Sequence, residues 1–336
     1  MATEAKQYLL ASLSLSRELG DKSGTASALE KLANLTHATF GEYAESKPLA
    51  VQSLALSREL GRPDWVAYAL DALGYITFCL GEYDEAESNY RESLSLFEAI
   101  GDRYGIAMAL GGMGLVLWAV GKNGEAATHL QKSLHICRTI GHQGQVAGRL
   151  AGLARIANDL GDYIQAQQLA QEGLAIAREL GSPVYLSHLL YCLGESAYRM
   201  GDLPAARAYL LEALHVTSET GLLAYLAIAL YHYAMLLIQE SEGEPAGAAQ
   251  KQAKALELLA LVQRHPATWH VYTARAGQQY GKLAARLPGE VTAIAAARAA
   301  SHTLAEVVAM LRSDLEAMRP APSTVAPKIA PRLANE

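Results

Sequence analysis

Apolar residues along most of this chain recur at three- and four-residue spacing, in blocks that a glycine ends about every twenty residues. This spacing places the apolar side chains on one face of an α-helix. Glycine tolerates the left-handed backbone conformation in which many helices end. The pattern therefore predicts a series of amphipathic helices of similar length. The glycines that mark their ends are Gly20, Gly41, Gly61, Gly81, Gly101, Gly121, Gly141, Gly161, Gly181, Gly201 and Gly221.

The pattern repeats with a period of about forty residues, so each unit holds two helices, which we name A and B. Helix A carries two leucines three residues apart and then a small residue, as at Leu70, Leu73 and Gly74. Helix B carries a small residue and, eight positions later, a leucine, as at Ala86 and Leu94. Small residues at fixed points allow neighbouring backbones to approach closely. A fixed period of this kind indicates a repeat array.

These features resemble the tetratricopeptide repeat family. The resemblance rests on the small residue after the leucine pair, on the Gly-acid-Tyr turn at 81–83, and on Ala86 with Tyr90. It covers about residues 1–262, although the period is longer than the family's usual value of roughly thirty-four and the proline that often ends a unit is missing. The resemblance implies an all-α fold: a right-handed α-solenoid of stacked antiparallel helix pairs, whose A helices line a concave groove.

We expect three regions: the array at 1–264, a short non-repeat C-terminal helical cap at 265–319, and a disordered Pro/Ala-rich tail at 320–336. Residues 2–20 match a B helix, so the array begins half a unit in. A lone B helix exposes the face that its A helix should cover, which favours a chain that is a piece of a longer protein. Two alternatives are that helix 2–20 is itself a cap and that its apolar face forms a homodimer.

After Arg264 the repeat period is lost. His265-Pro266 ends the preceding helix, because proline disfavours helix at the residue before it. Thr303 and Glu306 fit a capping box at the start of the last helix. The helices expected in this part of the chain are at about 267–286, 289–299 and 303–318.

A second resemblance covers about residues 253–312. This segment resembles the C-terminal end of the repeat arms of bacterial signal-transduction ATPases and related transcriptional regulators. The resemblance implies a sensor arm, with the nucleotide-binding switch on a longer parent chain, since these residues contain no such switch.

The amino-acid composition limits the kinds of partner that we expect. The net charge is −6 and no dense Lys/Arg stripe occurs, so direct nucleic-acid binding is not expected.

Cys79, Cys137 and Cys192 lie among apolar helix residues and predict buried free thiols. The N-terminus lacks a secretory signal, which favours a cytoplasmic location. Residues 105–121 carry no charge, but they occupy the place of A helices that do, so we expect a buried helix and no membrane span.

No catalytic or nucleotide-binding motif is present, and the histidines form no metal-spaced pairs. His265 and His270 flank Trp269 with a proline between them, which is poor ligand geometry and predicts a packing or turn role. We therefore expect no enzyme activity, no catalytic residue, no cofactor and no metal.

The remaining candidate is the concave groove, where the family resemblance places the binding positions on the A helices. The aromatic candidates would supply contact area, and the charged ones would supply orientation or pair with one another. Several could instead pack against the neighbouring A helix. The candidates are Tyr68, Asp71, Tyr75, Phe78, Trp118, Arg155, Asn158, Asp159, His188, Tyr191, Glu195, Tyr198, Arg199 and Tyr231.

Two functions fit such a groove. In the first, it docks a protein or peptide partner. In the second, it encloses a small-molecule effector and biases a switch domain on a longer parent chain. A narrow aromatic pocket around Tyr68, Tyr75, Trp118 and Tyr191 favours the small molecule, whereas an open charged trough favours the protein.

Overall fold

The computed structural model describes residues 2–243 and 247–311, which form sixteen α-helices and no strand. The helices are α1 (Ala2–Glu18), α2 (Lys22–Phe40), α3 (Tyr43–Glu59), α4 (Pro63–Leu80), α5 (Tyr83–Ile100), α6 (Arg103–Ala119), α7 (Asn123–Thr139), α8 (Gln143–Leu160), α9 (Tyr163–Leu180), α10 (Pro183–Met200), α11 (Leu203–Thr220), α12 (Leu223–Gly243), α13 (Ala248–Arg264), α14 (His270–Ala284), α15 (Gly289–Ser301) and α16 (Leu304–Met310).

The glycine pattern marks the helix ends as predicted. All eleven marker glycines have a positive φ, between 60° and 86°. At the end of α4, the Gly81 N–H donates to the Phe78 carbonyl at 3.0 Å and the Glu82 N–H donates to the Thr77 carbonyl at 2.9 Å. These bonds satisfy carbonyls that the helix leaves open at its end.

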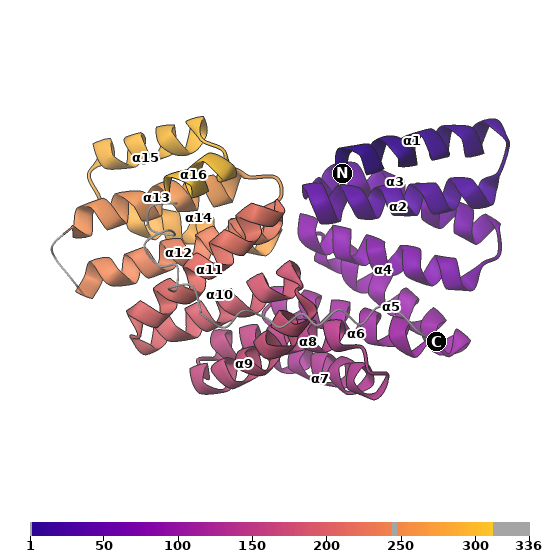
Figure 1. Ribbon diagram of the computed structural model, residues 1–336, viewed down its shortest axis with the longest axis horizontal. Coiled ribbons are helices and arrows are strands. Elements are labelled where there is room, and N and C mark those ends of the chain that lie inside the picture. Colours follow the sequence, from indigo (N-terminus) through magenta and orange to yellow (C-terminus); the bar gives the residue numbers. More distant parts are fainter. Residues whose placement is uncertain (1, 244–246, 312–336) are drawn as a thin grey trace, which may run out of the picture.

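The helices stack in sequence into one curved array (Figure 1). From α1 to α14 each helix packs against the next, and consecutive even-numbered helices from α2 to α12 also contact one another. The even-numbered helices, which are the A helices, therefore line the inner, concave side, and the B helices lie outside. This confirms the prediction of an all-α solenoid. Its two arms, α1–α5 and α10–α16, stand on either side of α6–α9 (Figure 1).

The small residues of the A helices make room for B-helix side chains. The Tyr90 ring of α5 is 2% exposed and lies between Gly74 of α4 and Gly112 of α6. A Cβ atom would approach this ring to 3.0 Å at Gly74 and to 2.1 Å at Gly112. The glycines thus set how closely two successive A helices can pack around one aromatic ring.

Ion pairs connect successive B helices on the outer face. Arg58 of α3 pairs with Glu92 at 2.7 Å, and two repeat units later Arg138 of α7 pairs with Glu172 at 2.5 Å. Arg178 and Glu212 repeat the contact at 3.1 Å. Each of these side chains is about half exposed, so each pair contributes on the order of 0.2–1 kcal/mol.

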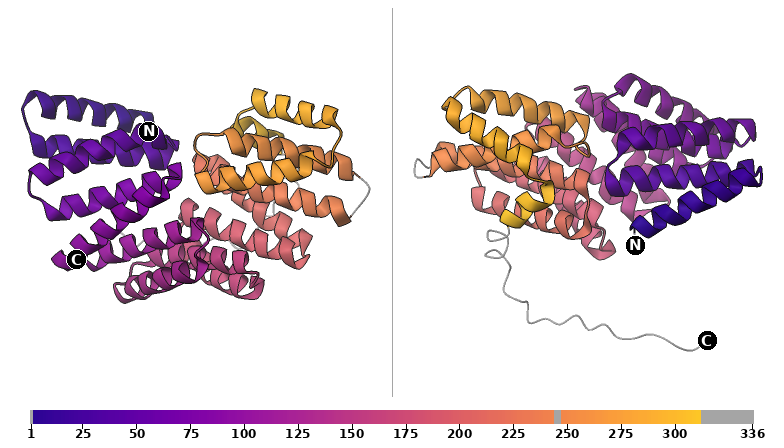
Figure 2. Two further views of the ribbon diagram at one scale, coloured as in Figure 1. Left: turned by 180° about the vertical axis from the view of Figure 1, so that it is seen from behind. Right: turned by 90° about the horizontal axis from the view of Figure 1, so that it is seen from above.

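The C-terminal helices fold back over the array instead of extending it. The chain turns after α13, with the Thr268 N–H donating to the His265 carbonyl at 3.0 Å, so α14 starts at His270 and not at 267. Figure 2 shows α13–α16 beside the end of the array. The capping box of Thr303 and Glu306 is present. The expected end of the last helix, 312–318, and the tail 320–336 lie outside the described residues.

Two helices, α12 and α6, are unusually apolar. By length and composition α12 could cross a membrane, but 72% of its most apolar stretch is buried inside the fold. The shorter α6, which contains the uncharged stretch, packs between α5 and α7. The three cysteines are free and buried, as predicted.

The first helix has no A helix on its outer side. It packs on α2 through Leu13, which is 6% exposed. Tyr8 and Leu15 are 77% and 56% exposed. The half-buried leucines and isoleucines at the position of Leu15 in later B helices, such as Leu96 and Ile136, pack against the core.

Candidate functional site

The chain's own segment Trp269–Arg275, at the start of α14, fills the concave face. Trp269 is 1% exposed, and its Nε1 donates to the Tyr43 hydroxyl of α3 at 3.1 Å. Its ring centroid lies 5.5 Å from that of Phe78 and 6.2 Å from that of Tyr75, both on α4 and both edge-on. These aromatic contacts tie α14 to the N-terminal arm.

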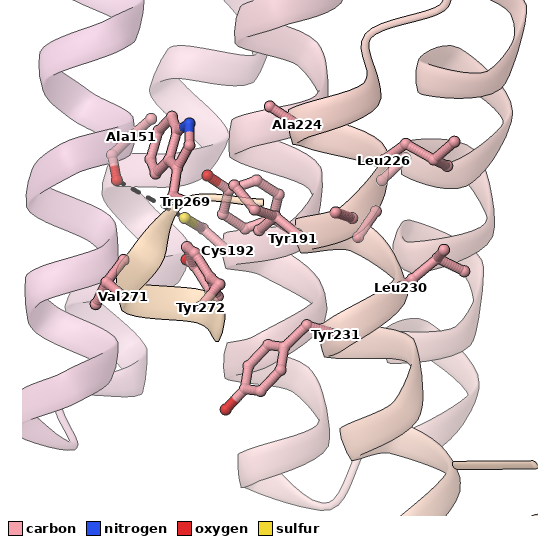
Figure 3. Packing of buried hydrophobic residues seen from close by; sticks show 14 of the residues in the cluster. Ala151, Tyr191, Cys192, Ala224, Leu226, Leu230, Tyr231, Trp269, Val271 and Tyr272 are labelled. Atoms are coloured by element: carbon pink, nitrogen blue, oxygen red, sulfur yellow. Dashed lines mark hydrogen bonds between the residues drawn. The ribbon is translucent and has the colours of Figure 1, made fainter. Parts of the chain in front are cut away.

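The same indole also contacts the other arm. The His188 ring of α10 and the Tyr225 ring of α12 lie edge-on to it, with centroids at 5.8 Å and 5.9 Å. Figure 3 shows Trp269 and Tyr272 between the helix that carries Ala151 and the helices that carry Tyr191 and Tyr231. Trp269 therefore joins the two arms of the array.

Two marker glycines make room for this connection. A Cβ at Gly41, at the end of α2, would lie 2.4 Å from the Ala267 Cβ, and one at Gly81 would lie 2.4 Å from the His270 ring. Both glycines have a positive φ. Glycine is required at both positions for backbone conformation and for space.

A charged contact holds the other end of the segment. Arg275 donates to both carboxylate oxygens of Asp159 on α8, at 3.2 Å and 2.7 Å. Trp118 Nε1 of α6 donates to the same carboxylate at 2.6 Å. The guanidinium carbons of Arg155 and Arg275 lie 4.1 Å and 5.0 Å from the Trp118 ring centroid. The bidentate ion pair and the stacked cations position α14 with defined geometry.

Most other titratable groups below α14 are shifted toward their neutral forms. Burial, with Asp159 nearby, raises the pKa of Glu195 to about 7. Burial, with Arg275 nearby, lowers the pKa of His232 well below its ordinary value. The His232 ring stacks on Tyr191, with an interplanar angle of 7°, and neither of its nitrogens has a hydrogen-bond partner in the described part of the chain. Arg155 and Arg275 differ from these groups, because neighbouring groups raise the pKa of each guanidinium above its ordinary value although burial opposes the rise.

A second polar contact lies further along the groove. The Arg149 guanidinium of α8 lies over Gly111 of α6, where a Cβ would come within 2.1 Å of it. It donates to Gln145 at 2.7 Å. Asp71 lies on α4, the A helix before α6. Burial raises the pKa of the Asp71 carboxyl to about 7, although the nearby positive charge of Arg149 opposes this rise.

The structure brings most of the predicted groove residues around α14 and buries many of them. Tyr68 is different: its hydroxyl donates to Asp102 at 2.6 Å and its ring packs on Phe97. The four aromatic residues whose clustering would favour a small molecule therefore do not form one pocket. Asn158 donates to the Cys192 carbonyl at 2.9 Å and ties α8 to α10. The predicted residues that are buried are Phe78, Trp118, Arg155, Asn158, Tyr191, Glu195, Tyr198 and Tyr231.

Sequence reasoning missed three residues of this site: Trp269, Tyr272 and Arg275. A signal for them exists, because Trp269, Tyr272, Ala276 and Leu283 are spaced as one face of a helix, and the structure buries all four. That pattern predicts a buried helix face, but it does not say which surface covers it.

A cavity of about 610 Å³ remains beside α14, open to solvent. Trp118, Asp159 and Arg275 form one wall, and Tyr83 and His270 form another. Its volume lies in the range of small-molecule sites, roughly 300–1,000 Å³. The described residues contain no group of three or more His, Cys, Asp or Glu side chains that could hold a metal ion.

The sequence profile of the tetratricopeptide repeat family matches residues 35–99, 65–139 and 105–179. No curated protein sequence matches the chain.

Among solved structures, aspartyl phosphate phosphatase F from Bacillus subtilis is similar, with 11% identity and a TM-score of 0.54, over 87% of this chain and 75% of that one. A Rap protein complexed with Competence and Sporulation Factor has 13% identity and a TM-score of 0.53, over 91% and 84%. A signal transduction ATPase with a tetratricopeptide repeat sensor, from Pyrococcus horikoshii, has 15% identity and a TM-score of 0.47, over 85% and 48%.

At these identities the structural likeness concerns the fold alone. The family profile, the glycine-marked helix pairs and the stacked array agree with one another. The matched part of the chain, residues 35–179, therefore consists of tetratricopeptide repeats.

Proposed function

We propose that this protein is a non-catalytic interaction scaffold that holds a polypeptide partner against its concave face. One observation carries the proposal: that face already holds a polypeptide segment, Trp269–Arg275, through an aromatic cage and a bidentate ion pair. The Rap protein that shares this fold, complexed with Competence and Sporulation Factor, is consistent with such a use.

The alternative is a small-molecule effector sensor. The cavity of about 610 Å³ favours it, because polar groups of Asp159, His270 and Arg275 converge there beside the Trp118 ring. In both cases we propose that the chain acts as the sensor or interaction arm of a bacterial regulator, in which binding at the groove biases a switch domain elsewhere.

Site-specific photocrosslinking tests the proposal. A photoreactive amino acid replaces Tyr83, which lines the cavity, in the full chain. The matched control replaces Tyr163, which occupies the same repeat position two units later and is likewise partly buried, but does not line the cavity. We expect the Tyr83 variant, and not the control, to capture a polypeptide in cells. The purified partner should then bind the wild-type chain and bind Trp118→Ala at least tenfold more weakly.

Identical capture at both positions would contradict a groove-directed interaction. If no polypeptide binds, while a small molecule raises the melting temperature of the wild-type chain but not of Trp118→Ala, the sensor alternative replaces the scaffold.

A further inference from the structure

The segment in the groove is held by two anchors. Trp269 is the aromatic anchor and Arg275, six residues later, is the charged one. Trp269 is the extended residue just before α14, and Arg275 lies in the second turn of that helix. The groove offers one receptor for each anchor: the aromatic cage around Trp269, and the carboxylate of Asp159.

Each receptor selects a particular chemistry. The cage places the Tyr43 hydroxyl where an indole N–H can donate to it, so it favours tryptophan among the aromatic residues. Both oxygens of Asp159 accept from one guanidinium, a geometry that arginine fits and lysine does not. The receptors are therefore complementary to a Trp–Arg pair at this spacing and not to apolar surface in general.

We call the groove surface that holds Trp269–Arg275 the concave seat. With the segment bound there, some buried polar atoms have no hydrogen-bond partner in the part of the chain that the structure describes. Both ring nitrogens of His232, the His188 Nε2 and the Asn158 Oδ1 have no hydrogen-bond partner within the described residues. Buried polar groups without partners disfavour the state that contains them. The segment thus satisfies the polar groups of its two anchors and leaves these buried atoms without a hydrogen-bond partner on any described residue.

While the segment is in place both receptors are occupied, because Trp269 is 1% exposed in its cage and Arg275 bonds both carboxylate oxygens of Asp159. We propose that the concave seat recognises a segment of a protein partner that carries a tryptophan just before a helix and, six residues later, an arginine in that helix, and that this segment binds by displacing the chain's own Trp269–Arg275. The inference rests on the proposed function and specifies the partner and its control.

A peptide competition experiment tests the inference. The probe is a fluorescent peptide with the sequence of residues 265–284. It is titrated by fluorescence anisotropy against the wild-type full chain and against a released variant, Trp269→Ala with Arg275→Ala. Arg286→Ala is the matched control variant, because this exposed arginine follows α14 and contacts neither receptor. Arg275→Ala alone is the second variant, because it keeps the buried indole if the double change prevents folding.

We expect the peptide to bind the released variant at least tenfold more tightly than it binds the wild-type chain or Arg286→Ala. A peptide lacking the arginine should lose about ten- to hundredfold in affinity, the loss typical of a charge-assisted hydrogen bond. Asp159→Asn in the released background should cause a similar loss for the original peptide and none for the arginine-free one.

Three outcomes would overturn the inference: equal affinity for wild-type and released chains, equal affinity of the peptides with and without arginine, or a dimer in which the segment of one copy fills the groove of another. If the partner captured at Tyr83 binds while this peptide does not, the partner chemistry is wrong and the proposed function stands. If neither binds the released variant, both fail.

Discussion

Replacing Glu195 with glutamine should stabilise the protein in a way that depends on pH. Glu195 is 6% exposed on α10, and burial is the main cause that raises its pKa from 4.5 to about 7. Asp159 adds to the shift, while Arg275, Arg199 and a hydrogen bond from Tyr198 oppose it. The folded state therefore binds this proton more tightly than the unfolded state does.

The sign and size follow from linkage. Between pH 4.5 and about 7 the folded state holds more protons, so the contribution of Glu195 to the free energy of unfolding falls as pH rises through this range. A pKa unit corresponds to about 1.4 kcal/mol, so ionisable Glu195 costs about 3 kcal/mol above pH 8 and about 1 kcal/mol at pH 5.5. Glutamine resembles the neutral acid and lacks this cost. E195Q should gain these amounts, and it should match the wild type near pH 4.

Urea denaturation at pH 4, 5.5 and 8.5 measures the gain as the difference between E195Q and the wild type. The comparison is needed because His232 acts in the opposite direction: its lowered pKa supplies stability that is lost as pH falls below 6.5. Glu242→Gln is the control, since that side chain is 53% exposed. A difference between E195Q and wild type that stays constant with pH, or that shrinks toward pH 8.5, would refute the reasoning.

Two further predictions concern the repeat packing and the outer ion pairs. Gly112→Ala should destabilise the chain by about 1–3 kcal/mol in thermal or urea unfolding, because its Cβ would enter the Tyr90 ring. Gly124→Ala, in a helix with open space around it, should be neutral or stabilising by up to about 1 kcal/mol, and equal effects at both glycines would contradict the steric account. Arg138→Glu should cost less than about 1 kcal/mol in 0.1 M salt, and adding Glu172→Arg should restore it; a loss that persists in the double variant would show that packing, not charge, holds this contact.

Much of the fold could be predicted because the positions of glycine and of apolar residues determine the helices locally. Glycine needs no tertiary information to end a helix, and the marker glycines set the ends of helices such as α4 and α10 at Gly81 and Gly201. The small position at Gly74 likewise indicated close packing of a neighbouring helix, which the structure identifies as that of Tyr90.

The candidate site was less predictable because it depends on a contact between distant segments. The A-helix positions of Trp118, Arg155 and Asp159 follow from the repeat, and the structure places them at the groove. The repeat does not predict which segment covers these residues. The segment that begins at Trp269 lies outside the repeat period, and its apolar face could pack on many surfaces. The positive φ of Gly41 is a local property, but its need to admit Ala267 is not.

The hydrogen bond between Trp269 and Tyr43 joins residues separated by 226 positions. In an open solenoid, stability is close to a sum over neighbouring repeats, so either end can fray while the other stays folded. This long-range contact changes that behaviour, because it forms only when the first pairs and the last are both in place. A contact over so long a loop has a high closure cost, so we expect it to form late in folding. Once formed, this contact couples unfolding at one end of the array to unfolding at the other. A chain built from local repeats should then unfold as a single cooperative unit.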